Sequence, residues 1–117
     1  MTPYIPLKKT KTSDKPKTEI HIDKSKINLG DINLNKIYKD SIRITNRGNT
    51  DLYISEIESS CECTQVEYKK LSLAPSESTC LYITFRPEGK GYFERYVSIH
   101  CNIANSPIEI LINGRVK

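Results

Sequence analysis

The sequence predicts an all-β protein: an immunoglobulin-like antiparallel β-sandwich of about seven to eight strands. Three observations predict it. Short runs of Ile, Leu, Val and Tyr alternate with polar residues at every second position. Gly, Pro and Asn interrupt these runs with turn chemistry, as at 46–49 and 87–91. No stretch combines helical spacing with a cap and enough length, so the crossover helices that a parallel α/β sheet requires are missing.

The expected strands follow one another in chain order. Apolar side chains alternate at 20–22, 27–29, 38–44, 52–54, 66–68, 71–73, 81–85, 93–101 and 108–112. Ile57 falls one residue out of phase with Ile54, which predicts a β-bulge in that strand. Ile83 and Val97 are expected in the core, on facing sheets.

The chain divides into a short tail and one domain. Residues 1–17 are rich in Lys, Thr and Pro and have little to bury, so we expect 1–17 to be a disordered tail or tether and 18–117 to be the Ig-like domain. The formal net charge of +4 arises in this tail, where five lysines oppose one aspartate. Because a nucleic-acid binder concentrates basic groups on its folded module, we expect no nucleic-acid partner.

Four stretches together resemble a known family: Asn46-Arg47-Gly48 with Leu52 and Ile54, Ser60-Cys61-Glu62-Cys63-Thr64, Leu73-Ala74-Pro75, and Phe85-Arg86-Pro87 with Gly91 and Phe93. From about Ile27 to Val116 the chain resembles the bacterial domain-of-unknown-function 1573 family, common in Bacteroidetes. That family is similar to the ASH, Hydin and major-sperm-protein group of Ig-like domains. It usually has Gly where this chain has Glu62 and Ser76. If those positions need positive φ, both residues are strained or the turns differ locally.

The resemblance implies an exported protein, often a lipoprotein, in the periplasm or cell envelope, and no enzymatic activity. The Lys-rich tail would then be a tether, and membrane contact would occur only through an N-terminal lipid anchor absent from this sequence. Met1 to Pro6 is too short for a signal peptide, so a cytoplasmic location also stays open. No apolar run approaches the length of a membrane span.

Cys61, Cys63 and the adjacent Thr64 form the sharpest local motif. They could serve as a redox pair, half of a metal site or a partner-binding loop, whereas the plain structural reading has one Cys packed as a small apolar side chain. A bond between the two would close an unusually tight ring. Thiol activation normally needs a nearby cation or a helix N-terminus, and a metal needs more ligands than two Cys supply. We expect no metal site and no cofactor.

The other two cysteines fall at different phases. Cys101 is in phase with Val97 and should point inward and be inert, whereas Cys80 should point outward or lie at a sheet edge. The expected strand directions separate Cys61 and Cys63 from the later pair by about 20 Å. We therefore expect no disulfide between the two groups and no four-Cys metal site. Any covalent link should lie within a group, with Cys80–Cys101 favoured.

Tyr53, Tyr96 and His100 are expected on one outer sheet face, which makes them a candidate partner face because exposed tyrosines are enriched at interfaces. The alternative is cross-strand tyrosine pairing that only steadies the sheet. No Ser-His-Asp order, G-x-S-x-G motif, phosphate loop or paired-carboxylate motif is present, so no catalytic residue is expected. Glu56 and Glu58 are expected to be solvated strand residues.

Two classes of function remain. The first is a non-catalytic, exported Ig-like interaction or scaffold module for an unknown protein partner, which such folds bind through loops, faces or edge strands. A variant of it is a structural component of a larger assembly with an obligate partner. The alternative is a thiol–disulfide or metal-handling protein that uses Cys61 and Cys63.

Overall fold

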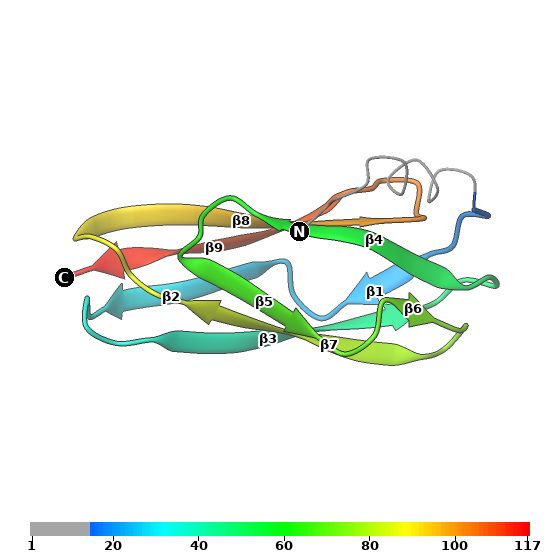
Figure 1. The fold of residues 1–117 in the computed structure, drawn as a ribbon, viewed down its shortest axis with the longest axis horizontal. Coiled ribbons are helices and arrows are strands. Elements are labelled where there is room, and N and C mark those ends of the chain that lie inside the picture. Colours follow the sequence, from blue (N-terminus) through cyan, green and yellow to red (C-terminus); the bar gives the residue numbers. More distant parts are fainter. Residues whose placement is uncertain (1–14) are drawn as a thin grey trace.

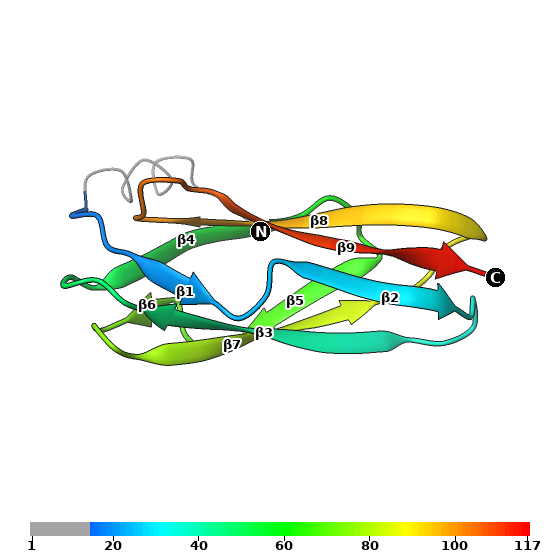
Figure 2. The ribbon, with the colours of Figure 1, turned by 180° about the vertical axis from the view of Figure 1, so that it is seen from behind.

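Two β-sheets face each other in the computed structural model, which describes residues 15–117 (Figures 1 and 2). One sheet has the strand order β1-β3-β7-β5 and the other has the order β2-β9-β8-β4-β6. The strands are β1 (Ile20–Ile22), β2 (Lys26–Ile32), β3 (Tyr38–Asn46), β4 (Leu52–Ser59), β5 (Thr64–Tyr68), β6 (Ser72–Leu73), β7 (Ser78–Phe85), β8 (Gly91–Cys101) and β9 (Ile108–Val116).

The expected Ig-like sandwich is confirmed, with two differences. The described residues form nine strands because the short β1 and β6 are counted separately. The described strands pair antiparallel except β2 and β9, which run parallel with Ile27 opposite Ile112, and an isolated parallel bridge joins Thr18 to Ile103. Parallel strands need a long connection, and here nearly the whole domain lies between the two strands in the chain. None of the described residues forms a helix that could span a membrane.

The core confirms the phase of the alternating runs. Ile83 of β7 is 3% exposed and Val97 of β8 is fully buried, so the two lie inward on facing sheets. The expected bulge is present in β4, where the pairing with β8 shifts register between Ile54 and Glu56. At one end of the sandwich the rings of Phe85 and Phe93 stack with their centroids 4.6 Å apart. Burial of such side chains is the main driving force for the fold.

A fully buried asparagine, Asn46, joins three segments at the other end of the sandwich. Its side-chain oxygen accepts hydrogen bonds from the Thr18 hydroxyl at 2.7 Å and from the Gly48 amide at 3.0 Å. Its amide nitrogen donates to the carbonyl oxygens of Thr50 at 2.8 Å and Leu73 at 2.9 Å. All of its hydrogen-bonding capacity is thus used inside the protein. A Cβ at Gly48 would collide with the Thr18 side chain, so this turn requires glycine.

Asn102 is also fully buried, and its side chain joins the segment that enters β1 to the start of β4. Its amide nitrogen donates to the carbonyl oxygens of Pro16 at 2.8 Å and Asp51 at 2.9 Å, and its oxygen accepts from the Tyr53 amide at 2.6 Å. The Lys15 Nζ also lies over the Tyr53 ring, 4.3 Å from its centroid, so described contacts with the sandwich begin at Lys15, three residues before the expected start of the domain. The expected tail, 1–17, lies mostly outside the described residues, and its boundary stays a prediction.

The two positions at which the family usually has Gly behave differently. Ser76 has a φ of +76°, in the left-handed region, at the third position of a turn in which the Glu77 amide donates to the Ala74 carbonyl at 2.9 Å. Pro75 at the second position and a positive φ at the third are the features of a type II turn. Glu62 has no positive φ, so its loop accepts an ordinary side chain.

Candidate functional site: the Cys61–Cys63 loop and the outer face of the five-stranded sheet

The loop that carries Cys61 and Cys63 crosses from one sheet to the other, between β4 and β5 (Figure 1). Backbone hydrogen bonds fix both of its ends. The Ser60 amide donates to the Tyr96 carbonyl at 2.9 Å, and the Arg86 amide donates to the Cys63 carbonyl at 2.8 Å. The motif is therefore held against β8 on one side and the end of β7 on the other, as part of a rigid scaffold.

Cys61 and Cys63 form a disulfide with their Cα atoms 5.1 Å apart. Cys61 is partly exposed, whereas Cys63 is 3% exposed. The expectation that any link lies within a group is confirmed, but the favoured pair was wrong, because Cys80 and Cys101 are both free. Cys80 lies on the outer side of the four-stranded sheet and Cys101 faces the core from the other sheet, so their thiols point away from a common site.

The expected orientations of the two free cysteines are confirmed. Cys101 is 4% exposed, and burial raises the pKa of its thiol to about 11, which keeps it protonated and inert at neutral pH. Cys80 is partly exposed on β7. The Cys63 carbonyl accepts a hydrogen bond from the Arg86 amide, six positions further along the chain than Cys80. Six positions of extended chain correspond to about 20 Å, which confirms the separation of the two groups.

Arg95 places a positive charge beside the disulfide. Its Nε donates to the Cys63 Sγ at 3.4 Å, in partly buried surroundings. The hydroxyl of Thr64, which is 3% exposed, lies 3.7 Å from the same sulfur. A cation and a hydrogen-bond donor at this distance stabilise a sulfur that becomes negatively charged. Of the expected motif residues, Cys63 and Thr64 thus lie together beside the Arg95 guanidinium.

Glu88 gives the other sulfur a different environment. Its Oε1 lies 3.5 Å from the Cys61 Sγ, and the Cys63 amide donates to the same sulfur at 3.1 Å. A carboxylate disfavours negative charge on a neighbouring atom. The two sulfurs of one disulfide therefore face opposite charges.

Sequence reasoning missed both charged neighbours. A signal for Arg95 was present, because it stands in the inward phase between Phe93 and Val97, where a charged residue needs a partner. Nothing local pointed to Glu88, which reaches Cys61 from the β7–β8 turn across 27 positions of chain.

The structure places Tyr53, Tyr96 and His100 on the outer face of the five-stranded sheet, as expected, but does not bring the tyrosines together. The Tyr53 amide bonds to Asn102, whereas the Tyr96 amide bonds to the Ser60 hydroxyl. Asn102 follows Tyr96 by six positions of extended chain, so the backbones of Tyr53 and Tyr96 are about 20 Å apart. Cross-strand pairing of Tyr53 with Tyr96 is therefore excluded by the register.

Between the two tyrosines lies a polar cluster of Glu56, Glu58 and His100. The His100 Nε2 contacts the Glu58 Oε1 at 2.7 Å, and the potential metal-ligand atoms of all three residues lie within 4.8 Å of one another. Glu58 is exposed as expected, but Glu56 is half-buried. The other such group in the described residues is Cys61, Cys63 and Glu88, whose sulfurs are already bonded to each other and so are not thiolate ligands.

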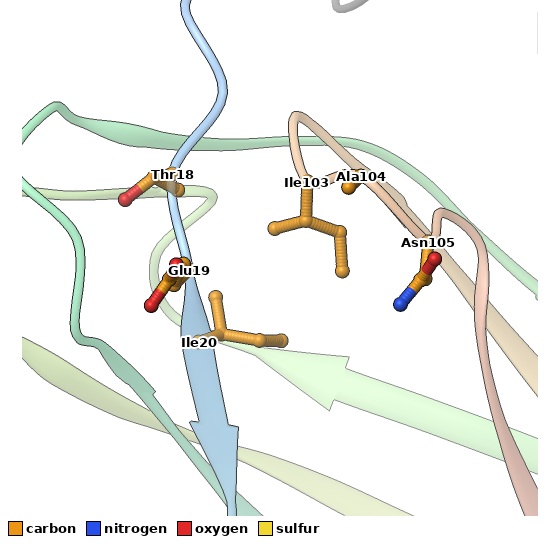
Figure 3. Close-up of a pocket in the computed structure, with 6 residues that line it drawn as sticks. All are labelled: Thr18, Glu19, Ile20, Ile103, Ala104 and Asn105. Atoms are coloured by element: carbon orange, nitrogen blue, oxygen red, sulfur yellow. The ribbon is translucent and has the colours of Figure 1, made fainter.

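A pocket opens between the segment that enters β1 and the loop after β8 (Figure 3). Figure 3 shows Ile20 and Ile103 extending into it from opposite sides. Its lining residues are Thr18, Glu19, Ile20, Ile103, Ala104 and Asn105. Glu19 is the one ionisable side chain among them, so this lining offers no acid–base pair.

The two-sheet sandwich defines the class of protein, an Ig-like domain. The chain belongs to the family described as "Protein of unknown function (DUF1573)", whose model matches residues 20–116. The resemblance inferred from the four sequence stretches is therefore confirmed. No curated protein is significantly similar to this sequence.

Solved structures show the same fold. A protein of unknown function from Porphyromonas gingivalis W83 is 19% identical with a TM-score of 0.77, over 86% of this chain and 47% of that one. The ASH/PapD-like domain 7 of human CEP192 is 16% identical with a TM-score of 0.69, over 88% and 89%. WR4, an MSP family member of C. elegans, is 14% identical with a TM-score of 0.53, over 86% and 99%. This chain thus spans about half of the Porphyromonas protein.

Proposed function

We propose that this chain is a non-catalytic, exported interaction module that binds a protein partner through the outer face of its five-stranded sheet. The observation that carries the proposal is a pair of exposed tyrosines on β8: Tyr92 is 61% exposed and Tyr96 is 39% exposed. Leu111 of β9 lies directly opposite Tyr96 in the sheet and is half-buried. Tyrosines supply large contact areas at low entropic cost, and they are enriched in binding sites.

The charge of this face favours a basic partner. Around Tyr96, exposed carboxylates of the described strands outnumber exposed cations. Glu94 precedes it on β8, and Glu58 and Glu109 both lie opposite Ser98 on the flanking strands. The exposed cations of these strands are Lys26, which lies beside Leu111, and Arg115, which lies further away, opposite Tyr92. Such an arrangement attracts positively charged surfaces and raises their rate of association. The partner that fits is a protein that presents Lys or Arg around an apolar centre. His100 and Tyr53 extend the same face beyond Ser98.

The proposed location is the periplasm or cell envelope. The Cys61–Cys63 disulfide supports it, because disulfides persist in oxidising compartments and are rare in the cytosol. A lipid anchor attached ahead of residues 1–17 would make that Lys- and Pro-rich segment a spacer between the domain and the membrane. Fractionation of the native cell tests this proposal: the protein should follow the envelope fraction, and recovery in the cytosol would contradict it.

The test of the binding face compares tyrosines on opposite faces. The full chain is immobilised and exposed to a native envelope extract. Tyr92→Ala with Tyr96→Ala should abolish capture of the partner, because the contact centre is removed. Tyr82→Ala is the matched control, since Tyr82 is 45% exposed on β7 in the other sheet.

Loss of capture only in the Tyr92 and Tyr96 variant supports the proposal. Loss only in the Tyr82 variant, equal capture by all three proteins, or no specific capture by the unaltered chain would overturn it. Raising the salt concentration should weaken the capture, because the proposed face attracts its partner through exposed charges.

A further inference from the structure

We propose that the Cys61–Cys63 disulfide is a thiol–disulfide exchange site, at which a dithiol of a partner protein attacks Cys61 and the sulfur of Cys63 is the leaving group. This chemistry is stoichiometric and uses none of the side chains of the tyrosine face, so it stands independently of the proposed binding function. Three features of the described residues carry it: the exposure of Cys61, the Arg95 guanidinium beside Cys63, and the Glu88 carboxylate beside Cys61.

Access favours attack at Cys61. Exchange requires a thiolate to reach one of the two sulfurs directly. Cys61 is partly exposed in the β4–β5 loop, whereas Cys63 is 3% exposed and packed beneath that loop. An incoming sulfur therefore meets Cys61 first.

The charge on each side favours the same direction of cleavage. Arg95 Nε, 3.4 Å from the Cys63 Sγ, stabilises the thiolate that forms there when the disulfide opens. A better-stabilised thiolate leaves faster. Glu88, 3.5 Å from the Cys61 Sγ, opposes negative charge on that sulfur. The Cys63 amide, 3.1 Å from the same sulfur, favours it but has no net charge, so only Cys63 has a cation beside it.

The reaction balances as follows. A partner thiolate bonds to the Cys61 sulfur, the bond between Cys61 and Cys63 breaks, and its electron pair remains on Cys63 as a thiolate. The second partner thiol, after losing its proton, attacks the partner sulfur of this mixed disulfide and releases Cys61. Two electrons and two protons pass in total, so that the partner dithiol becomes a disulfide and Cys61 and Cys63 become thiols.

A purely structural disulfide explains the site less well. The stabilisation from a cross-link grows with the length of the loop that it closes, and this bond joins residues only two positions apart. The β4–β5 loop is already held by the backbone hydrogen bonds of Ser60 and Cys63. A bond with little to constrain and a charged partner for each sulfur fits exchange chemistry.

The test uses dithiothreitol as the dithiol and the full chain in its oxidised form, with Cys80→Ser to remove the exposed free thiol. The rate of reduction is followed by acid quenching at intervals, alkylation of the protein thiols and intact-protein mass spectrometry. Arg95→Gln should slow reduction about threefold to tenfold, because the leaving thiolate loses its cation. Arg95→Lys should retain most of the rate. Arg115→Gln is the matched control, since Arg115 is exposed on β9 opposite Tyr92, three positions along β8 from Arg95, and should leave the rate nearly unchanged.

A second measurement identifies the attacked sulfur. Brief reaction with glutathione followed by acid quenching and fragmentation mass spectrometry should find glutathione on Cys61. Glutathione on Cys63, or equal rates for the Arg95→Gln and Arg115→Gln variants, would overturn the proposal. Thermal melting of the oxidised variants, measured first, distinguishes a folding defect from a change in the rate of reduction. Neither measurement involves Tyr92 or Tyr96, so its outcome is independent of the binding test.

Discussion

The hydroxyl of Thr18 donates a hydrogen bond of 2.7 Å to the side-chain oxygen of Asn46, across 28 positions of the chain. Both residues are buried. This contact joins the segment before β1 to the turn after β3, at the end of the sandwich opposite the disulfide. Stability at that end therefore depends on a polar network as well as on apolar packing.

Replacing Asn46 should show how much this network contributes. Asn46→Ala would leave the Thr18 hydroxyl, the Gly48 amide and two backbone carbonyls without their partner in a buried site. We expect the free energy of unfolding to fall by about 2–4 kcal/mol, measured by denaturant titration. Asn105→Ala, at an exposed position of the β8–β9 loop, should change it by less than about 0.5 kcal/mol. Similar losses in both variants would show that the Asn46 network is not specific.

Ser76 should be a site of easy stabilisation. A non-glycine residue with a φ of +76° is strained, and glycine adopts this conformation without strain. Glycine also increases the entropy of the unfolded chain, which offsets part of this relief, so we expect Ser76→Gly to raise the free energy of unfolding by only about 0.5–1 kcal/mol. Glu62→Gly is the informative comparison. Glu62 has no positive φ, so the same replacement there should bring no gain, and a gain at Glu62 with none at Ser76 would contradict the turn geometry.

Asp40 should make stability weakly dependent on acid pH. Burial raises the pKa of Asp40, but hydrogen bonds from Lys24 and from the Ser41 amide outweigh it and hold that pKa below its ordinary value of 3.8. The ionised carboxylate therefore stabilises the fold above the unfolded-state pKa, and this contribution is lost as the pH falls through the folded-state pKa.

The Lys24–Asp40 pair is 2.8 Å long and about one-third exposed, so its contribution is small. We expect Asp40→Asn to lower the free energy of unfolding at pH 7 by less than about 1 kcal/mol. The difference from the unaltered protein should shrink as the pH falls below the ordinary carboxyl pKa of 3.8 and vanish below the folded-state pKa in a denaturant series over pH. If the difference in the free energy of unfolding grew toward acid pH, Asp40 would not be the carboxylate with the lowered pKa.

Much of the sandwich could be predicted from the sequence because strand phase is a local property. The alternation around Ile83, Val97 and Cys101 was sufficient to assign their inward positions, and the phase shift between Ile54 and Ile57 was sufficient to locate the bulge. Which strands become neighbours is not local. The parallel pairing of β2 with β9 and the count of nine described strands depend on how the chain changes sheets, and alternation carries no information about that.

The site was less predictable, for the same physical reason. The sequence identified Cys61 and Cys63, but their chemistry depends on Arg95 and Glu88, which come from β8 and the turn before it. Tyr53 and Tyr96 were correctly placed on one face, yet their separation depends on the β4–β8 register. Side-chain neighbours between strands are determined by register, which is fixed only when the whole sandwich assembles.

The central claim is that the outer face of the five-stranded sheet binds the partner, and hydroxyl-radical footprinting tests it most directly. The four most exposed tyrosines on described strands are Tyr92 and Tyr96 on this face and Tyr68 and Tyr82 on strands of the other sheet. On addition of the captured partner, oxidation of Tyr92 and Tyr96 should fall severalfold, because binding removes them from solvent, while oxidation of Tyr82 should stay unchanged. Protection of Tyr82 with Tyr92 and Tyr96 still oxidised would contradict the claim.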